Sequence, residues 1–377
     1  MEKNRKKFEL FVFLSTFSRS LIEVFIPIIL YKFGYTLKEV IFYFMMSHVF
    51  SFIIAFPFIW ISKKYNNKIL TFIGIIAFVI LQILLNNITS SIYYLLLIGF
   101  LFAVYRRGYW ISRRYYNMKV IKKENVASTF SIISIINHLG VLISSYVGSL
   151  LLDFMDINTV TYISIALFLI SLIPLFKMEF KHIENNSKIN IIQTLKNVSF
   201  RNMYLFGTYE LVNVVKFLFT LYLFIYVKDT YSTVGLFNLI TNISVLVFTY
   251  SYGKKIDGKK NFLKASIILT VLTYILKANT TYIMLVIASC LEGLFIRMYE
   301  ISISKEFYVL SKKFEYNDYN LMYEISQNAA RSITLFILFI SNMNLKLMIY
   351  TVLFFILLGM FIDFKQSDSK DYIEKES

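Results

Sequence analysis

The sequence contains few of the side chains on which most enzymes depend. Cys290 is the only cysteine, so the chain has no intrachain disulfide and no thiolate cluster for a metal. The three histidines, His48, His138 and His182, lie far apart in sequence and form no metal-binding motif. No glycine-rich phosphate loop is present, which argues against the use of ATP. We therefore expect no catalytic cluster, no cofactor and no metal, and a protein that is not an enzyme.

Charged residues are also scarce, and long apolar runs are frequent. Only 16% of the 377 residues are charged, whereas 57% are hydrophobic and the mean hydropathy is +0.63. Soluble domains are nearer to about 25% charged. Apolar runs of about 18 residues or more, the length of a membrane-spanning helix, recur along the whole chain. They lack the alternation of a transmembrane barrel strand. The composition therefore predicts an all-α polytopic membrane protein.

Twelve apolar segments are long enough to cross a bilayer, and polar or turn residues separate them. We expect spans at 8–32, 39–62, 69–86, 91–112, 125–152, 159–176, 202–227, 231–252, 261–278, 281–304, 320–341 and 345–363. Of the 39 Lys and Arg, 28 fall on the side of the two termini and 5 on the other side. Positive residues stay in the cytoplasm, so this bias predicts a multi-pass protein of the cytoplasmic membrane with both termini cytoplasmic. The basic residues on that side would interact with anionic lipid headgroups, which accounts for the net charge of +16. We therefore expect no nucleic-acid partner.

An internal repeat relates the two halves of the chain. A shift of 191 residues aligns "SKKYNNK" (62–68) with "GKKIDGK" (253–259), and it also sets Arg106 on Arg297. One shift that matches both loops and span interiors indicates two six-helix halves. The expected organisation is an N-terminal half at 1–176, a cytoplasmic linker at 177–201, a C-terminal half at 202–364 and a cytoplasmic tail at 365–377.

Twelve spans in a 6+6 repeat, with basic loops after spans 2 and 8, resemble the major facilitator superfamily (MFS). The signature loop of that family reads G-x-x-x-D-[RK]-x-G-[RK]-[RK]. "GKKIDGKK" (253–260) is similar to a shortened copy, with Gly253 and Asp257 in place. The resemblance implies a permease for a small-molecule substrate that works by alternating access. It also implies that helices 1, 4, 7 and 10 line a central cavity, while helices 3, 6, 9 and 12 support them from outside.

Charged side chains within the spans are the candidates for function. Each costs about 2.5–3.5 kcal/mol near the bilayer centre, so it needs a partner, water or a role. Eleven charged residues lie in the interior of the spans, and nine of them fall in spans 1, 4, 7 and 10. The candidates for the substrate and proton cavity are Arg19, Glu23, Arg107, Glu210, Lys216 and Glu292. The candidates for structural or gating charges are Arg106, Arg297, Glu300, Glu324 and Arg331, with Gly253 and Asp257 of the loop. Structural ion pairing between helices is the alternative interpretation for each charge.

The stretch "YRRGYWISRR" (105–114) concentrates four of the arginines. We interpret Arg113 and Arg114 as positive-inside anchors that tolerate exchange to Lys. Because the repeat aligns Arg106 with Arg297, we expect Arg106 to have a structural role in both halves. We therefore expect Arg107 to contact the substrate or a carboxylate in the cavity.

These features predict a secondary active transporter that uses protons or another ion gradient. We interpret His48 and His138 as packed or pore-lining residues and not as proton relays, and assign proton binding to Glu210 and Glu292. Small residues in "LGVLISSYVGSLLLD" (139–153) are similar to span 5 of the exporting branches of the family. They favour efflux of an amphipathic or peptide-like compound. The alternatives are uptake of an anionic nutrient, or a lipid mover or non-transporting receptor on the same scaffold. We expect a monomer in contact with membrane lipids.

Overall fold

Twelve membrane-spanning helices form the fold, which a computed structural model describes for residues 2–120, 126–179, 200–252, 262–278, 281–311, 316–341 and 343–361. No strand occurs in these ranges. The first span is divided into α1 (Glu2–Ser20), η1 (Glu23–Phe25) and α2 (Ile26–Lys32). The remaining elements are α3 (Leu37–Lys64), α4 (Asn67–Leu85), α5 (Ile92–Val120), α6 (Val126–Phe154), α7 (Ile157–Phe176), α9 (Phe200–Tyr222) with the π-helical turn η3 (Leu223–Val227), α10 (Tyr231–Tyr252), α11 (Phe262–Ala278), α12 (Tyr282–Ser311), α13 (Tyr316–Ile340), and α14 (Leu345–Leu358) with η5 (Gly359–Phe361). The twelve spans predicted from the sequence are confirmed.

Nine of the described helices are individually long and apolar enough to cross a membrane. The other three are α11, α13 and α14. Within the described ranges α11 has 17 residues and α14 has 14, so each is shorter than a full span. In contrast, α13 is long enough at 25 residues but carries Glu324 and Arg331 in its middle. Composition alone therefore understates the number of spans where a helix is short or has charged partners.

Side-chain caps set where several helices begin. Thr36 and Glu39 form a capping box at the start of α3, in which each side chain accepts a hydrogen bond from the other residue's backbone amide. Asp156 accepts a hydrogen bond from the backbone amide of Thr159 at the start of α7. Hydrogen bonds from Thr159 lower the pKa of the Asp156 carboxyl, because they stabilise its charged form.

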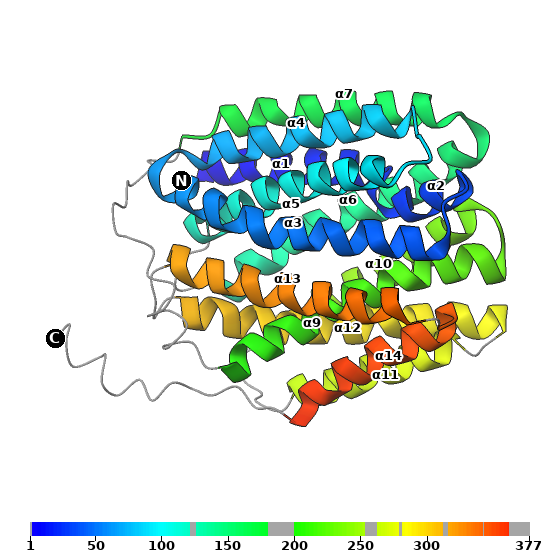
Figure 1. The fold of residues 1–377 in the computed structure, drawn as a ribbon. Helices are drawn as coiled ribbons and strands as arrows, with labels where there is room; N and C mark the ends of the chain where they lie inside the picture. The colour runs from blue at the N-terminus through cyan, green and yellow to red at the C-terminus, as the bar shows by residue number, and fades with distance from the viewer. Residues whose placement is uncertain are drawn as a thin grey trace.

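The helices run along one common direction, and α1 begins and α14 ends towards the same end of the bundle, which we call the terminus end (Figure 1). In the first group of helices, α1 packs on α6 and α7, and α5 packs on α3 and α4. In the second group, α9 packs on α13 and α14, and α12 packs on α10 and α11. The two groups meet where α3 lies along α13 and α6 lies along α10.

Contacts between the groups join them at the end remote from the termini, which we call the opposite end. Asp153, at the end of α6, accepts hydrogen bonds from the backbone amides of Tyr231 (2.9 Å) and Ser232 (2.8 Å) in the first turn of α10. Its carboxylate thus caps a helix of the other group. Between α3 and α9, the rings of Phe44 and Phe217 stack with their centroids 4.0 Å apart.

The described start of the linker is fastened to the first group. The Lys68 ammonium donates hydrogen bonds to the backbone carbonyls of Phe176 (3.0 Å) and Met178, and Lys7 donates to that of Lys177. These cations lie at the carbonyl end of α7, where the helix dipole favours positive charge. Residues 180–199 of the expected linker lie outside the described residues.

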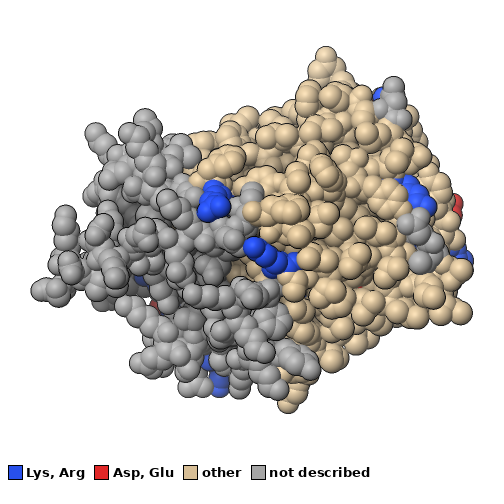
Figure 2. All heavy atoms as spheres, turned by 90° about the horizontal axis from the view of Figure 1, so that it is seen from below, with Lys and Arg blue, Asp and Glu red and all other residues tan. Residues whose placement is uncertain are grey.

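The side of the bundle between its two ends is apolar. Figure 2 shows one such face, on which the few visible Lys and Arg side chains lie near the grey region at one end or at the opposite end. Large hydrophobic side chains remain exposed on the helices, including those of Ile53 in α3, Ile80 in α4 and Leu97 in α5. An exposed apolar band of this kind is what a helix bundle presents to lipid.

Close approach of α4 and α5 requires glycine at position 108. A Cβ atom added at Gly108 would lie 2.4 Å from the backbone oxygen of Leu70 and 3.0 Å from the Cα of Gly74. Both obstacles are backbone atoms, so the helices themselves would have to separate. We expect Gly108→Ala to destabilise the folded protein by about 1–3 kcal/mol, the usual cost of overpacking. The measurement is the thermal unfolding midpoint of the purified protein in detergent.

Gly99→Ala in the same helix is the matched control. A Cβ atom at Gly99 would lie 3.5 Å from the backbone oxygen of Tyr43, which is an ordinary contact. Equal unfolding midpoints for the two alanine variants would contradict this view of the α4–α5 contact.

Candidate functional site

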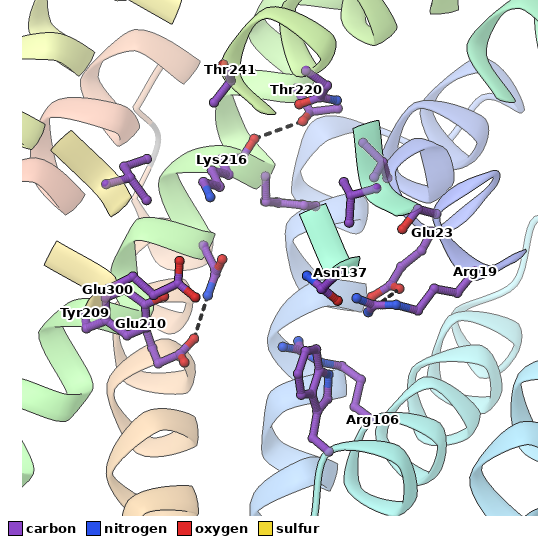
Figure 3. A pocket seen from close by; sticks show the side chains of 18 of the residues that line it. Arg19, Glu23, Arg106, Asn137, Tyr209, Glu210, Lys216, Thr220, Thr241 and Glu300 are labelled. Atoms are coloured by element: carbon purple, nitrogen blue, oxygen red, sulfur yellow. Dashed lines mark hydrogen bonds and ion pairs between the residues drawn. The ribbon is translucent and has the colours of Figure 1, made fainter. Parts of the chain in front are cut away.

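A cavity of about 510 Å³ lies between the two helix groups. Its walls come from the first span and from α3, α5, α6, α9, α10, α12 and α13. Among the described residues, α4, α7 and α14 contribute nothing to the lining, and α11 contributes Lys277 alone. In Figure 3 the labelled residues of the first group face those of the second group across the cavity.

The first wall is built where the first span is interrupted. The regular helix α1 ends at Ser20, and Arg19 lies in its last turn, where exposed carbonyl groups favour a cation. The Arg19 guanidinium donates a hydrogen bond to the Glu23 carboxylate at 3.0 Å and lies 5.2 Å from the centroid of the Trp110 ring. Arg106 also points into the cavity from α5 (Figure 3). In the described part of the chain it has no carboxylate within ion-pair distance.

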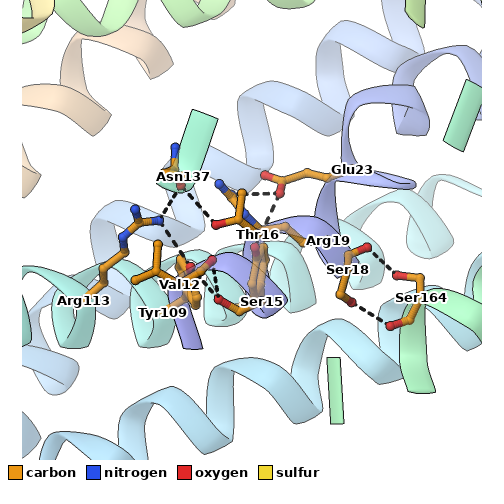
Figure 4. Close-up of polar contacts among 11 residues, drawn as sticks. Val12, Ser15, Thr16, Ser18, Arg19, Glu23, Tyr109, Arg113, Asn137 and Ser164 are labelled. Carbon is orange, nitrogen blue, oxygen red and sulfur yellow. Dashed lines mark hydrogen bonds and ion pairs between the residues drawn. The ribbon is translucent and has the colours of Figure 1, made fainter. Parts of the chain in front are cut away.

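Polar contacts behind this wall fix its position. The amide oxygen of Asn137 in α6 accepts hydrogen bonds from the Thr16 hydroxyl (3.0 Å) and from the Arg113 guanidinium (2.9 Å), as Figure 4 shows. Ser18 and Ser164 each donate a hydroxyl hydrogen bond to the other's backbone carbonyl, at 2.6 and 2.8 Å. These contacts tie α1 to α5, α6 and α7, and so fix the position of the helix whose last turn carries Arg19.

On the second wall, α9 places Glu210 and Lys216 in the lining. The Glu210 carboxylate forms an ion pair with Arg331 of α13 and accepts a hydrogen bond from the Asn213 amide at 2.6 Å. Both partners of this ion pair are buried. Lys216, by contrast, is exposed to the cavity and has no carboxylate within ion-pair distance in the described part of the chain.

Glu292 of α12 lies in a buried cluster beside the cavity. It forms an ion pair with Lys277 of α11, and its carboxylate accepts hydrogen bonds from the hydroxyls of Tyr274 (2.8 Å) and Thr241 (3.3 Å). Lys277 and Glu292 are only 3% and 4% exposed. The sequence gives no sign of this role, because a lysine near the end of a span, such as Lys277, is ordinarily free to reach the interface.

A second ion pair, between Arg297 and Glu300, lies further along α12. The Arg297 guanidinium is fully buried and contacts the Glu300 carboxylate at 2.9 Å and the Thr249 hydroxyl at 2.9 Å. Glu300 faces the cavity, with His138 of α6 at 3.9 Å. Arg297 is therefore a buried structural partner, whereas Glu300 is accessible from the cavity.

Glu324 of α13 lies between two arginines of α5. Its carboxylate forms ion pairs with both Arg107 and Arg114, and its side chain is fully buried. The Arg114 guanidinium also donates a hydrogen bond to the Asn320 amide oxygen at 2.8 Å. This cluster joins the two helix groups on the terminus side of the cavity.

Arg113 and Arg114, interpreted from the sequence as positive-inside anchors that tolerate exchange to Lys, have specific partners in the structure. Arg113 is 5% exposed and donates hydrogen bonds to Asn137 and to the Tyr109 hydroxyl (3.2 Å). Arg114 is paired across the group boundary with Glu324. A count of charges predicts a side of the membrane but not the partners that each arginine has on other helices.

The remaining candidates divide as follows. Arg107 contacts a carboxylate, as expected, but that carboxylate is Glu324 in the boundary cluster. Arg106, expected in a structural place, lies in the cavity lining instead. Gly253 and Asp257 lie outside the described residues.

Comparisons with known proteins agree with this architecture. Residues 9–254 match the profile of the Major Facilitator Superfamily. Among curated proteins, no relative matches the sequence. Similar solved structures include a bacterial homologue of the iron transporter ferroportin in an outward-facing state, with a TM-score of 0.68, and a mutant of the nucleoside transporter NupG, with a TM-score of 0.71. Each is 12% identical to this chain, and each alignment covers 95% of this chain and 98% of the other.

At 12% identity, these two likenesses show the fold and no more. The profile match is the stronger finding, because it extends over more than half of the 377 residues. The chain therefore belongs to the Major Facilitator Superfamily, and it is a multi-pass membrane transporter.

Proposed function

We propose that the protein is a secondary active transporter for a small organic solute that carries an anionic group, either zwitterionic or peptide-like. Two cavity cations support this proposal. Arg106 and Lys216 come from opposite helix groups, and in the described part of the chain neither has a carboxylate within ion-pair distance. The cavity carboxylates of Glu23, Glu210 and Glu292 each have a cation partner. The lining thus offers uncompensated positive charge to a bound solute.

The transport cycle that we propose is alternating access between two units. The units are the helix groups within 1–176 and 202–364, joined by the linker at 177–201, and the terminus end faces the cytoplasm. Inter-group contacts exist on both sides of the cavity, at Asp153 on the opposite end and at Glu324 on the terminus side. Rocking of one unit against the other would break one set of contacts while it keeps the second.

Export driven by a proton gradient is the direction that we propose. The small residues of α6 support it through their resemblance to exporting branches of the family. A Cβ atom added at Gly148 would lie 2.4 Å from the carbonyl oxygen of Leu21, just after α1 in the first span, and Gly235 of α10 leaves room for Ser149. The small residues of α6 therefore lie against the first span of their own group and against α10 of the other group, where the two units would slide.

Uptake of an anionic nutrient is the second candidate, and the same two cations favour it. Everted and right-side-out membrane vesicles separate the two directions. Each preparation is given a mixture of small metabolites and a pH gradient, and the contents are identified by mass spectrometry. We expect solutes with a carboxylate or phosphate group to accumulate in everted vesicles that contain the protein. Accumulation only in right-side-out vesicles would show uptake, and accumulation in neither would contradict transport of such solutes.

Lys216→Met and Arg106→Met test the proposed role of the cavity cations. We expect each variant to lower accumulation about tenfold or more, since a hydrogen bond to a charged group contributes roughly 1.5–3 kcal/mol. Lys228→Met is the matched control, because Lys228 is an exposed lysine directly after the same span and outside the cavity lining. Full accumulation by both cavity variants would contradict recognition of an anionic group by these residues.

A further inference from the structure

His138 and Glu300 face each other across the boundary between the two helix groups. His138 is on α6 of the first group, and Glu300 is on α12 of the second. The His138 Nε2 atom lies 3.9 Å from the Glu300 carboxylate. Their side chains are 17% and 25% exposed, and both line the cavity. The pair is therefore in reach of cavity water, which can deliver or remove a proton.

A neighbouring amide fixes which nitrogen of His138 carries the proton in the neutral ring. Asn242 of α10 donates its amide hydrogen to the backbone carbonyl of Asn238 at 2.8 Å, so its Oδ1 atom is the one that faces His138. That oxygen only accepts hydrogen bonds, and it lies 3.1 Å from Nδ1 of His138. Nδ1 must therefore be the protonated nitrogen, and Nε2 carries a lone pair.

Nε2 with its lone pair then lies 3.9 Å from an ionised carboxylate, so two acceptors are neighbours without a hydrogen between them. Arg297 forms an ion pair with Glu300 through the same carboxylate oxygen, Oε2, at 2.9 Å. Lys216 of α9 adds further positive charge near both groups. One proton between Nε2 and the carboxylate would convert this repulsion into a charge-assisted hydrogen bond.

We propose that His138 and Glu300 together hold one proton, and that this pair is where the proton gradient enters the transport cycle. The inference rests on the proposed function and moves the proton site from Glu210 and Glu292 to this pair. With the proton bound, α6 and α12 attract each other across the boundary. When the proton leaves, the lone pair and the carboxylate repel, which favours separation of the two groups on that side.

His48 provides an internal control within the same chain. Its Nδ1 atom lies 3.4 Å from the Asn328 Oδ1 atom, and Asn328 donates its amide hydrogen to the Glu324 backbone carbonyl. The same reasoning gives His48 the same neutral tautomer. No carboxylate lies within ion-pair distance of its ring in the described part of the chain.

Nitrogen NMR of the purified protein with ¹⁵N-labelled histidine tests the pair without any solute. The chain contains three histidines, so each signal can be assigned with one His→Gln variant. We expect neutral His138 to be protonated on Nδ1. In Glu300→Gln we expect proton binding at Nε2 to weaken about tenfold or more, as follows from losing a carboxylate at this distance. The His48 signals should not change, and Glu39→Gln, at the capping box of α3, should leave His138 unaffected.

Neutral His138 protonated on Nε2, or an unchanged titration in Glu300→Gln, would overturn the proposal. Vesicle transport gives a second, independent result for any solute that the wild-type protein accumulates. Glu300→Gln should lose accumulation driven by the pH gradient but keep exchange of that solute in the absence of a gradient. Gradient-driven accumulation at the wild-type level would place the proton site elsewhere. That result would contradict the proton site but not the proposed function. Absence of transport by the wild-type protein would contradict the proposed function but not the NMR result for the pair.

Discussion

Glu324→Gln is expected to cause the largest loss of stability of any single substitution around the cavity. The Glu324 side chain is fully buried and pairs with both Arg107 and Arg114. Removal of its charge takes their shared carboxylate away from two guanidinium groups in a medium of low dielectric constant. Breaking a buried ion pair from one side costs about 3–5 kcal/mol. The measurement is the apparent thermal unfolding midpoint of the purified protein at a fixed scan rate.

A double variant distinguishes this electrostatic cause from a local packing defect. Arg107→Gln combined with Glu324→Gln removes one charge of each sign and leaves Arg114 with its hydrogen bond to Asn320. We expect the double variant to unfold at a higher temperature than Glu324→Gln alone, since the two effects are coupled. Additive losses in the double variant, or an unchanged midpoint in Glu324→Gln, would contradict the role of Glu324 as a shared counter-ion.

Asp153→Ala is expected to open the opposite end of the bundle. The Asp153 carboxylate caps α10 of the other helix group through the amides of Tyr231 and Ser232. Loss of such a cap costs roughly 0.5–2 kcal/mol. That cost falls only on the conformation in which the two groups touch at this end, so it shifts the populations towards the open conformation by about twofold to thirtyfold.

Asp156→Ala is the matched control for this substitution. Asp156 lies three residues further along and caps α7 of its own group, through the backbone amide and hydroxyl of Thr159. Its loss removes a helix cap but no contact between the groups. We therefore expect Asp156→Ala to leave the balance between the open and closed conformations unchanged.

The sequence was sufficient to predict the spans, because bilayer thickness and apolar length determine them. The expected span at 39–62 is α3 (Leu37–Lys64), and the expected span at 231–252 is α10 (Tyr231–Tyr252). Ion pairs within one helix follow from spacing, as for Arg297 and Glu300, which are three residues apart on α12. Local rules suffice for features of this kind.

Partners on different helices could not be predicted from the sequence. Glu324 lies more than 200 residues from Arg107 and Arg114, and nothing in the local pattern of α5 indicates that pairing. Arg106 and Arg107 both line the cavity, but which of them meets Glu324 depends on the rotation of α5, and one residue of rotation is about 100°. The opposition of His138 and Glu300 arises only from the packing of α6 beside α10 and α12.

Distances between spin labels at both ends of the bundle test the central claim, alternating access by two rocking groups, most directly. In a Cys290→Ala background, one pair of labels at Phe33 and Asp229 spans the opposite end, and a second pair at Lys119 and Ser302 spans the terminus end. In Asp153→Ala we expect the first distance to lengthen and the second to shorten relative to the protein with Asp153, with no such change in Asp156→Ala. A terminus-end distance that stays the same or lengthens together with the other would contradict alternating access.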